Sequence, residues 1–388
     1  MPTTRRRMLA MLGAASTALA GCLSGGSSTP NLGDVTGTWP MVGRDSGHTR
    51  AVAAGPTDPS TAWTTTLDGV RSVGAPALVG GALYVPVDAV SERARHRYRI
   101  HALAAATGDE RWQVPLRAEP NGPPAVRGDR VVVTGRPSTD RGRVVGFETR
   151  YGGEEWLYDV DARITAPPTI RLGTAYVPDW RGRVHALSVG DGSVLWTRRI
   201  GADESGRQFS EPVAVRDRTL YLGSQAGDTG VLALDAGTGA VRWRRDTPGV
   251  TGGPIVDDDS VVVRAGESIV GFALDGTRQF TVTLPEPGSG PMAIDDGTVY
   301  APAGDALYAI DRDGTEAWRY ENDGQVGPPV VVGDAVVVRG EGELTGLSRG
   351  TGDVAWATEV AGTGSIVVTR RGIFASGENG TVVALGES

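Results

Sequence analysis

Lysine is absent from this 388-residue chain, so all 38 basic residues are arginines, and Cys22 is its single cysteine. Without lysine, the chain cannot contain a phosphate-binding loop of the Gly-x4-Gly-Lys-Ser/Thr type. One cysteine cannot build a disulfide framework. The four histidines (His48, His96, His101 and His185) show no metal-ligand spacing. The sequence therefore shows no recognisable catalytic constellation and favours a non-catalytic protein.

The charge balance is acidic, with 46 acidic residues against 38 basic ones and a formal net charge of −8. This balance argues against general nucleic-acid binding, which needs a basic surface. A lysine-free, acidic chain rich in Ala, Gly and Val is also associated with high-GC genomes and with salt-loving sources.

The N-terminus predicts export and lipid anchoring. Arg5 and Arg6 lie in a twin-arginine pattern followed by an apolar, Ala-rich stretch, and Leu19-Ala20-Gly21-Cys22 resembles a lipobox. We expect a Tat-type lipoprotein signal peptide at residues 1–21, lipidation of Cys22, and a flexible tether over 22–38. The protein would then be held at the extracellular or periplasmic face of the cytoplasmic membrane. A plain signal peptide or a short membrane anchor is the alternative, although the apolar stretch is short for a span.

The rest of the chain, residues 39–388, repeats one unit. Each unit has a Gly/Pro-marked start, an apolar triplet, a second apolar strand, a Gly-rich turn and an aromatic residue on the outgoing strand. The aromatic residues of the seven complete units are Trp112, Trp156, Trp196, Trp243, Phe280, Trp318 and Trp356. A period of 37 to 48 residues with four short strands per unit predicts an all-β fold, a β-propeller of four-stranded antiparallel blades.

An eighth unit ends at Ala384-Leu385-Gly386, where its turn and aromatic strand should begin. The missing strand is supplied by residues 61–67, which contain Trp63. We therefore expect eight blades, with the last one closed by an N-terminal strand, because an open ring would leave strand edges unpaired.

Candidate binding residues lie in the loops between the second and third strands and in the segments that lead into the innermost strands. Both sets should lie at the end of the ring where propellers hold ligands around their axis. Trp180 and Arg181 would form a stacking platform beside a cation. Glu211, Glu267 and Asp305 should surround the same opening, with Glu341 and Glu378; exposed loop residues without a specific role are the alternative.

Two further segments stand outside the repeat. Residues 39–49 carry Trp39 and should cover one end of the ring as a plug or clasp, with His48 packed in it and a ligand role for His48 as the alternative. Arg93, Arg95, Arg97 and Arg99 alternate, so they share one strand face. That face would contact an anion or lipid headgroup, or be a solvated hairpin surface balanced by nearby acids.

The segment Ala233-x-Asp235-x-x-Thr238-Gly239-x-x-x-Trp243 resembles the repeat of pyrroloquinoline-quinone (PQQ)-like β-propellers, and three other units match it in part. The resemblance covers about residues 39–388. It implies that each aromatic residue docks between adjacent blades, positioned by a Thr-Gly turn. The size, lipobox and eight blades are closest in architecture to the BamB-type lipoproteins of the bacterial outer-membrane β-barrel assembly machine.

The resemblance implies a monomeric scaffold without a cofactor, anchored by lipid, that binds another membrane or secreted protein or peptide. In an archaeal source, which has no outer membrane, only the scaffold role would carry over. The alternative is a PQQ- or metal-dependent quinoprotein oxidoreductase of alcohols or sugars, with PQQ and calcium as cofactors. Many such enzymes carry a vicinal disulfide that a single cysteine cannot form.

Overall fold

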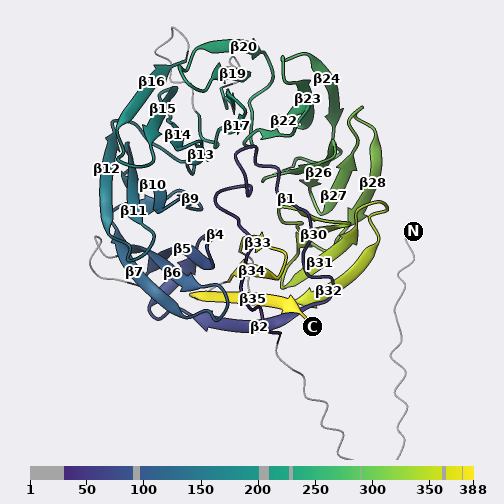
Figure 1. Ribbon diagram of the computed structural model, residues 1–388. Helices are drawn as coiled ribbons and strands as arrows, with labels where there is room; N and C mark the ends of the chain where they lie inside the picture. The colour runs from purple at the N-terminus through teal and green to yellow at the C-terminus, as the bar shows by residue number, and fades with distance from the viewer. Residues whose placement is uncertain are drawn as a thin grey trace, which may run out of the picture.

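The computed structural model describes residues 30–90, 97–200, 209–226, 230–288, 290–360, 364–377 and 379–388. In these residues the chain is all strand and turn, arranged as eight antiparallel blades around a central axis (Figure 1). The predicted eight-bladed β-propeller is thus confirmed. Arg5, Arg6, Cys22, Arg93, Arg95, His96 and Glu378 lie outside the described residues. No helix in the described part of the chain has the length and apolar character needed to cross a bilayer.

Each blade places its first strand at the axis and its fourth strand at the rim. The strands of blades 1 to 4 are β4 (Ala77–Val79), β5 (Ala82–Ala89), β6 (Tyr98–Ala104) and β7 (Glu110–Leu116); β9 (Ala125–Arg127), β10 (Arg130–Ser138), β11 (Arg141–Glu148) and β12 (Glu154–Val160); β13 (Thr169–Arg171), β14 (Thr174–Pro178), β15 (Arg183–Ser188) and β16 (Val194–Arg199); β17 (Ala214–Arg216), β18 (Thr219–Gly223), β19 (Val231–Asp235) and β20 (Val241–Arg245).

The strands of blades 5 to 8 are β21 (Ile255–Val256), β22 (Ser260–Ala265), β23 (Ser268–Ala273) and β24 (Arg278–Thr283); β25 (Ala293–Asp295), β26 (Thr298–Ala303), β27 (Ala306–Ile310) and β28 (Glu316–Glu321); β29 (Val330–Val332), β30 (Ala335–Arg339), β31 (Glu343–Ser348) and β32 (Val354–Glu359); β33 (Ile366–Val368), β34 (Gly372–Ser376), β35 (Thr381–Glu387) and β2 (Pro59–Thr66). Three short strands add to blades 1, 2 and 7: β3 (Val70–Val73), β8 (Glu119–Pro120) and β1 (Ala51–Val52).

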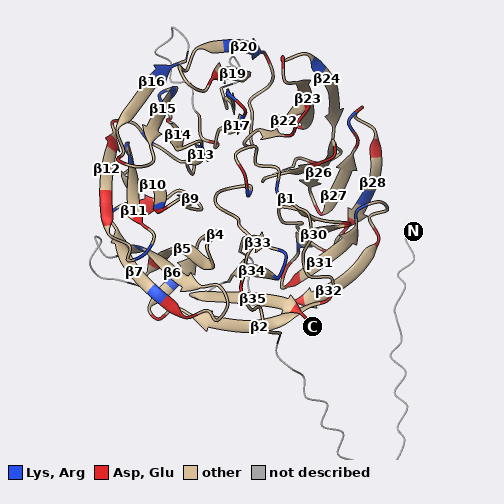
Figure 2. Ribbon diagram, viewed as in Figure 1, with Lys and Arg blue, Asp and Glu red and all other residues tan. Residues whose placement is uncertain are grey.

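Burial along each strand follows its place in the blade. The second and third strands are apolar on both faces because neighbouring blades cover both faces. The outermost strands alternate instead, as in β28, where Trp318 is buried and Glu316 and Arg319 are exposed. Figure 2 shows the result, with charge gathered on the outer strands and turns and largely absent from the inner strands.

The last blade is closed by the N-terminal strand, as predicted. β2 pairs antiparallel with β35, from Pro59 opposite Glu387 to Thr66 opposite Thr381. Figure 1 shows β2 and β35 side by side at this blade. The junction therefore leaves no unpaired edge between the first and last parts of the sequence.

In seven of the eight blades the aromatic residue packs on the Gly-rich turn of the next blade. Trp63, for example, donates its indole N–H to Ala105 O (3.0 Å), and its ring lies against Gly108, whose φ is +78°. A side chain at that glycine would meet the ring. The other indole donors and their acceptor carbonyls are Trp112 to Thr149, Trp156 to Val189, Trp196 to Ala236, Trp243 to Leu274 and Trp318 to Arg349. Phe280 packs on Gly314 without such a bond, and Trp356 packs against the core of blade 8.

The central channel is filled by residues 39–52, here called the plug (Figure 1). The plug contacts the innermost strand of seven blades in turn. These contacts join Trp39 to Leu78, Pro40 to Val126, His48 to Thr169, Ser46 to Val215, Gly47 to Val256, Thr49 to Ile294 and Arg50 to Val331. The sequence predicted a cover over one end of the ring; the structure instead threads the segment through the channel.

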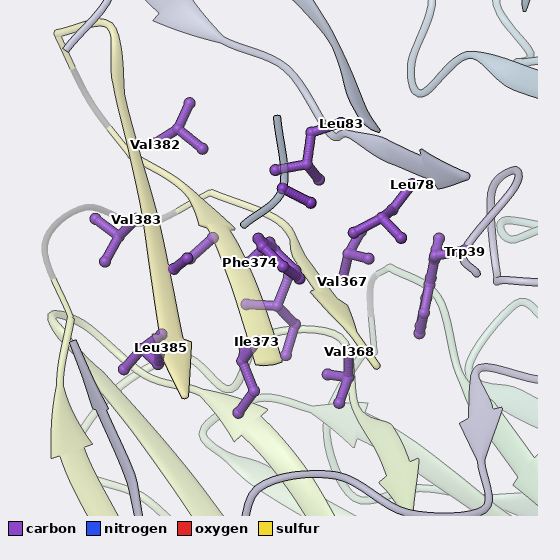
Figure 3. Close-up of a cluster of buried hydrophobic side chains, with 14 of the residues drawn as sticks. Trp39, Leu78, Leu83, Val367, Val368, Ile373, Phe374, Val382, Val383 and Leu385 are labelled. Atoms are coloured by element: carbon purple, nitrogen blue, oxygen red, sulfur yellow. The ribbon is translucent and has the colours of Figure 1, made fainter. Parts of the chain in front are cut away.

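The expected tether is corrected by the structure at its C-terminal end. Leu32 and Val35 are 2% and 6% exposed and belong to the core that blade 8 shares with Trp39. Figure 3 shows part of this core, with Trp39 and Leu78 beside Val367 and Phe374. Residues 30–38 are therefore packed on the propeller, because their apolar side chains have a surface to cover.

Candidate functional site

The two ends of the ring differ in chemistry. The loop face is formed by the segments that lead into the innermost strands and by the loops between second and third strands. The turn face is the opposite end, formed by the turns between first and second strands. A cavity of about 560 Å³ opens on the loop face, a size typical of ligand sites.

The loop-face cavity is built by blades 2 to 6 and by the plug. Its walls are Gly- and Pro-rich because each blade begins with such a segment, for example Gly122-Pro123 and Gly252-Gly253. The plug supplies the remaining surface with Val42, His48 and Arg50. The polar groups that line the cavity are Asn121, Thr165, Trp180, Ser210, Glu211, Gln225 and Thr251.

Trp180 and Glu211 are brought together in this cavity through a hydrogen-bonded series across blades 3 and 4. The Trp180 indole N–H donates to Thr165 Oγ1 at 2.7 Å, and Thr165 Oγ1 donates to Ser210 O at 3.1 Å. Ser210 Oγ then donates to Glu211 Oε1 at 3.4 Å. The side chains are thus positioned before any ligand arrives, which lowers the entropy cost of binding.

The stacking platform differs from the prediction in its cation. Arg163, not Arg181, lies over the Trp180 ring, with Cζ 4.2 Å from the ring centroid. Arg181 points away and forms an exposed ion pair with Asp161 at 3.5 Å. The arginine next to Trp180 in the sequence is therefore not the one that contacts its ring. The backbone N–H of Trp180 donates to Arg163 O, and this bond places Arg163 beside the ring.

The loop that carries Trp180 is held by the buried carboxylate of Asp179. This carboxylate accepts hydrogen bonds from the backbone N–H groups of Arg181 and Arg183, from Arg183 Nε, and from His185 Nε2. Burial alone would raise the pKa of Asp179, but the bonds from His185 and Arg183 outweigh burial and lower it. The loop is therefore anchored to its own blade and is a rigid support for Trp180.

The other predicted acids do not join Trp180. Glu267 and Asp305 are exposed on the loop face and do not line the cavity. Glu341 lines a neighbouring hollow beside Arg339 and Gly340. Sequence reasoning missed Asn121, Gln225 and Arg50, which line the cavity from different segments, and Arg163, which lies over Trp180. The polar residue directly before Gly122-Pro123 was the available signal for Asn121.

The plug side of the cavity carries a neutral imidazole and a buried guanidinium that remains charged at neutral pH. The His48 ring, which is 4% exposed, forms a hydrogen bond through Nε2 with Thr169 Oγ1 at 3.0 Å. Burial lowers the pKa of His48 to about 4. Arg50 donates from Nε to Pro329 O at 2.7 Å and lies over the Trp39 ring, and burial lowers its pKa to about 10.

The remaining polar residues singled out in the sequence form contacts within their own blade. Arg97 forms a bidentate pair with Asp88, and Arg99 donates to Gln113 Oε1, so the described half of that hairpin face is balanced by neighbours. His101 contacts Glu110 at 2.7 Å. Among the described residues, no group of three or more His, Cys, Asp or Glu side chains is arranged to hold a metal ion.

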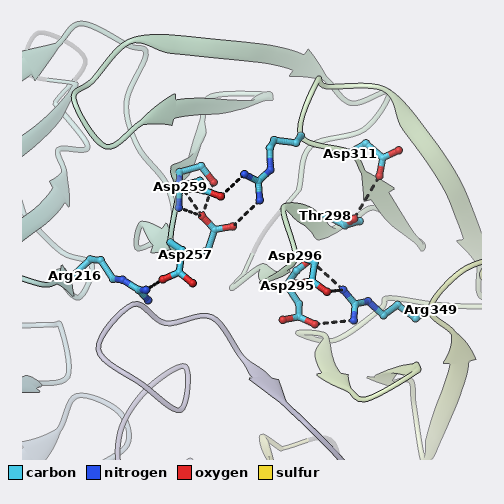
Figure 4. Close-up of polar contacts among 11 residues, drawn as sticks. Arg216, Asp257, Asp259, Asp295, Asp296, Thr298, Asp311 and Arg349 are labelled. Atoms are coloured by element: carbon cyan, nitrogen blue, oxygen red, sulfur yellow. Dashed lines mark hydrogen bonds and ion pairs between the residues drawn. The ribbon is translucent and has the colours of Figure 1, made fainter.

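The turn face carries a network of ion pairs that join blades 4 to 7 (Figure 4). Arg349 of blade 7 pairs with Asp295 and Asp296 of blade 6, and Arg216 of blade 4 pairs with Asp258 of blade 5. Arg312 links blade 6 to Asp257 and Asp259 of blade 5 in the same way. Exposed pairs contribute little singly, so we regard this network as a connection between neighbouring turns.

With this geometry established, the chain can be compared with known proteins. A family described as outer membrane protein assembly factor BamB matches residues 45–274 and 227–388. The chain belongs to this family. The resemblance to PQQ-like propellers of the BamB type is thereby confirmed.

Curated relatives of this family member match it only in part. BamB of Moranella endobia is 27% identical over 180 residues, which cover 43% of this chain and 42% of that one. The serine/threonine-protein kinase AfsK of Streptomyces griseus is 30% identical over 203 residues, which cover 46% of this chain and 23% of the kinase. The chain thus spans less than half the length of these two relatives.

Solved structures share the fold over most of the chain. BamB from Moraxella catarrhalis superposes with a TM-score of 0.67 at 18% identity, covering 84% of this chain and 99% of that one. The quinohemoprotein alcohol dehydrogenase from Comamonas testosteroni gives a TM-score of 0.71 at 16% identity, covering 91% of this chain and 81% of the enzyme. At such identities the likeness establishes the propeller fold alone.

Proposed function

We propose that this family member is a non-catalytic, monomeric scaffold, anchored by lipid at the outer face of the cytoplasmic membrane. It would bind a segment of another membrane or secreted protein in the loop-face cavity. The observation that carries the proposal is the prearranged series from Trp180 through Thr165 and Ser210 to Glu211. A rigid ring that presents fixed polar groups in an apolar cavity suits recognition of a ligand more directly than movement or catalysis.

The proposal is tested by capturing the partner. A photo-crosslinking residue in place of Gln225, which lines the cavity, should yield a protein adduct in native membranes, identifiable by mass spectrometry. The same residue in place of Asp258 on the exposed turn face is the control. Adducts from Asp258 alone, or from neither position, would argue against binding in the cavity.

Trp180→Ala should weaken capture of this partner by at least tenfold, because the ring offers both an apolar surface and the fixed end of the polar series. An alanine scan at interfaces finds such losses for central aromatic residues. Arg181→Ala is the matched control, since Arg181 adjoins Trp180 in sequence but pairs with Asp161 outside the cavity. Equal capture by wild type and Trp180→Ala, measured by crosslink yield, would contradict the proposal.

The alternative, a quinoprotein oxidoreductase, is favoured by the likeness in fold to the Comamonas testosteroni dehydrogenase. The residues of the cavity fit a quinone poorly. One face of Trp180 is already covered by Arg163, and Glu211 would repel the carboxylates of PQQ. The described residues also offer calcium no cluster of three acidic or histidine side chains.

We accordingly expect no saturable absorbance change when the purified protein is titrated with PQQ and calcium, and no dye reduction with alcohols or aldose sugars. A quinone needs a flat aromatic surface and cationic partners for its carboxylates. Stoichiometric quinone binding with substrate-dependent dye reduction would overturn the scaffold proposal and favour the oxidoreductase.

A further inference from the structure

Glu211 is a carboxylate in a largely apolar cavity, and no described cation forms an ion pair with it. Its described side-chain partner is the Ser210 hydroxyl at 3.4 Å, and no ion pair to Glu211 forms within the described residues. Burial raises the pKa of Glu211, and the Ser210 hydroxyl only partly opposes this effect. A carboxylate in such surroundings is stabilised when a cation arrives, because the cost of its desolvation is then offset by an ion pair.

The described basic residues in or beside the cavity have contacts other than Glu211. Arg50 donates to Pro329 O and lies over Trp39, while Arg163 lies over Trp180. His48 is neutral at pH 7, since burial lowers its pKa to about 4. Within the described residues, the charge of Glu211 is therefore open to a ligand.

A second polar group of the cavity lacks a partner among the residues that the structure describes. Asn121 lines the wall from blade 2, and its buried Nδ2 atom forms no hydrogen bond to any of these residues. Its backbone is held in place by the bond from Asn121 N to Thr134 O at 3.1 Å. A buried amide without an acceptor is destabilising, and a peptide carbonyl is an acceptor of the required kind.

The cavity walls between Glu211 and Asn121 suit a peptide residue with a long side chain. Pro123, Pro167 and Pro212 give apolar surface, and Gly252 and Gly253 bring backbone close to the cavity without side chains. An arginine or lysine can lay its alkyl stem on such walls while its charged end reaches a carboxylate. A main-chain carbonyl of the same segment can accept from Asn121.

Building on the proposed binding role of this cavity, we infer that its ligand is a peptide segment with a guanidinium or ammonium group that pairs with Glu211, while a carbonyl of the segment accepts from Asn121. The occupant is thus a basic stretch of a partner protein. The scaffold function alone does not say which chemical groups the cavity binds, and a cationic side chain with a neighbouring carbonyl supplies them.

The test uses the full-length protein in detergent and two fluorescent pentapeptides with capped ends, Gly-Ala-Arg-Ala-Gly and its citrulline counterpart. Citrulline keeps the shape of arginine and removes its charge. By fluorescence anisotropy, wild type should bind the arginine peptide at least tenfold more tightly. Glu211→Gln should abolish this difference, whereas Glu267→Gln, an exposed acid outside the cavity, should retain it. Asn121→Ala should weaken both peptides by a similar factor.

Several results would overturn the inference. These are equal binding of both peptides to wild type, no binding of either, or a preference for arginine that survives in Glu211→Gln. Arginine amide that competes as strongly as the pentapeptide would overturn the assignment to a peptide. Partner crosslinks at the cavity could be lost in Trp180→Ala but unchanged in Glu211→Gln. That result would overturn the inference of a cationic ligand group and leave the scaffold proposal standing.

Discussion

At the residue scale, the buried imidazole of His48 makes the stability of the plug depend on pH. Its pKa falls from 6.5 to about 4 because of burial, an effect that the Asp45 carboxylate and the Pro254 carbonyl oppose. The unfolded chain therefore binds a proton between these values that the folded chain does not bind. Stability is fully present above pH 6.5 and is lost as the pH falls toward 4.

We predict that the free energy of unfolding decreases by about 3 kcal/mol between pH 7 and pH 4 through His48, on the scale of 1.36 kcal/mol per pKa unit. His48→Gln keeps a hydrogen-bonding side chain for Thr169 but does not titrate, so its stability should vary less over this range. Chemical denaturation at several pH values measures both proteins. Parallel pH profiles for the two would show that another group governs the change.

At the element scale, the closing strand β2 depends on Trp63, whose ring packs on Gly108 and lies 6.1 Å from the Phe374 ring. Trp63→Ala should destabilise the protein by about 3 kcal/mol, the lower end of the range for aromatic truncation because this ring is partly exposed. Thermal unfolding compares it with Leu195→Ala, a control on an outer strand where the side chain is 55% exposed. An unchanged melting temperature in Trp63→Ala would contradict a role for Trp63 in closing the ring.

The elements were predictable from the sequence because each blade repeats its own signal. An apolar strand, a turn with a glycine such as Gly239, and an aromatic such as Trp243 recur in register, and the spare strand around Trp63 completed the count. The cavity was less predictable because several blades contribute to it, and the repeat period does not predict which loop residues of different blades meet. Asn121 and Gln225 come from distant loops, and Arg163 reaches Trp180 only through the folded chain.

At the scale of the whole molecule, the first described residues fix which end of the ring the anchor would approach. Leu32 lies against Gly372 and Gly33 against Arg371, both at the turn of blade 8 on the turn face. If Cys22 carries lipid, the chain from there to Pro30 spans at most about 28 Å. The turn face should then lie near the membrane, and the loop-face cavity should open away from it.

Energy transfer to a lipid-headgroup acceptor in liposomes tests this orientation. A fluorophore on Asp258→Cys, on the turn face, should transfer more energy than one on Glu267→Cys, on the loop face. An acylated Cys22 does not react with the dye. Adding Cys22→Ser should abolish transfer from both sites, and equal transfer from both in the anchored protein would contradict the orientation.

The plug and the closing strand also set the order in which the protein can be completed during synthesis. β2 leaves the ribosome early, yet its partner β35 follows roughly 300 residues later, and the plug contacts strands from seven successive blades. A nascent chain therefore holds its N-terminal strand and plug without all of their final partners until β35 has been synthesised. Such distant pairings slow folding and expose strand edges in the meantime. The finished ring thus appears in one late step, when the last strand to be made meets one of the first.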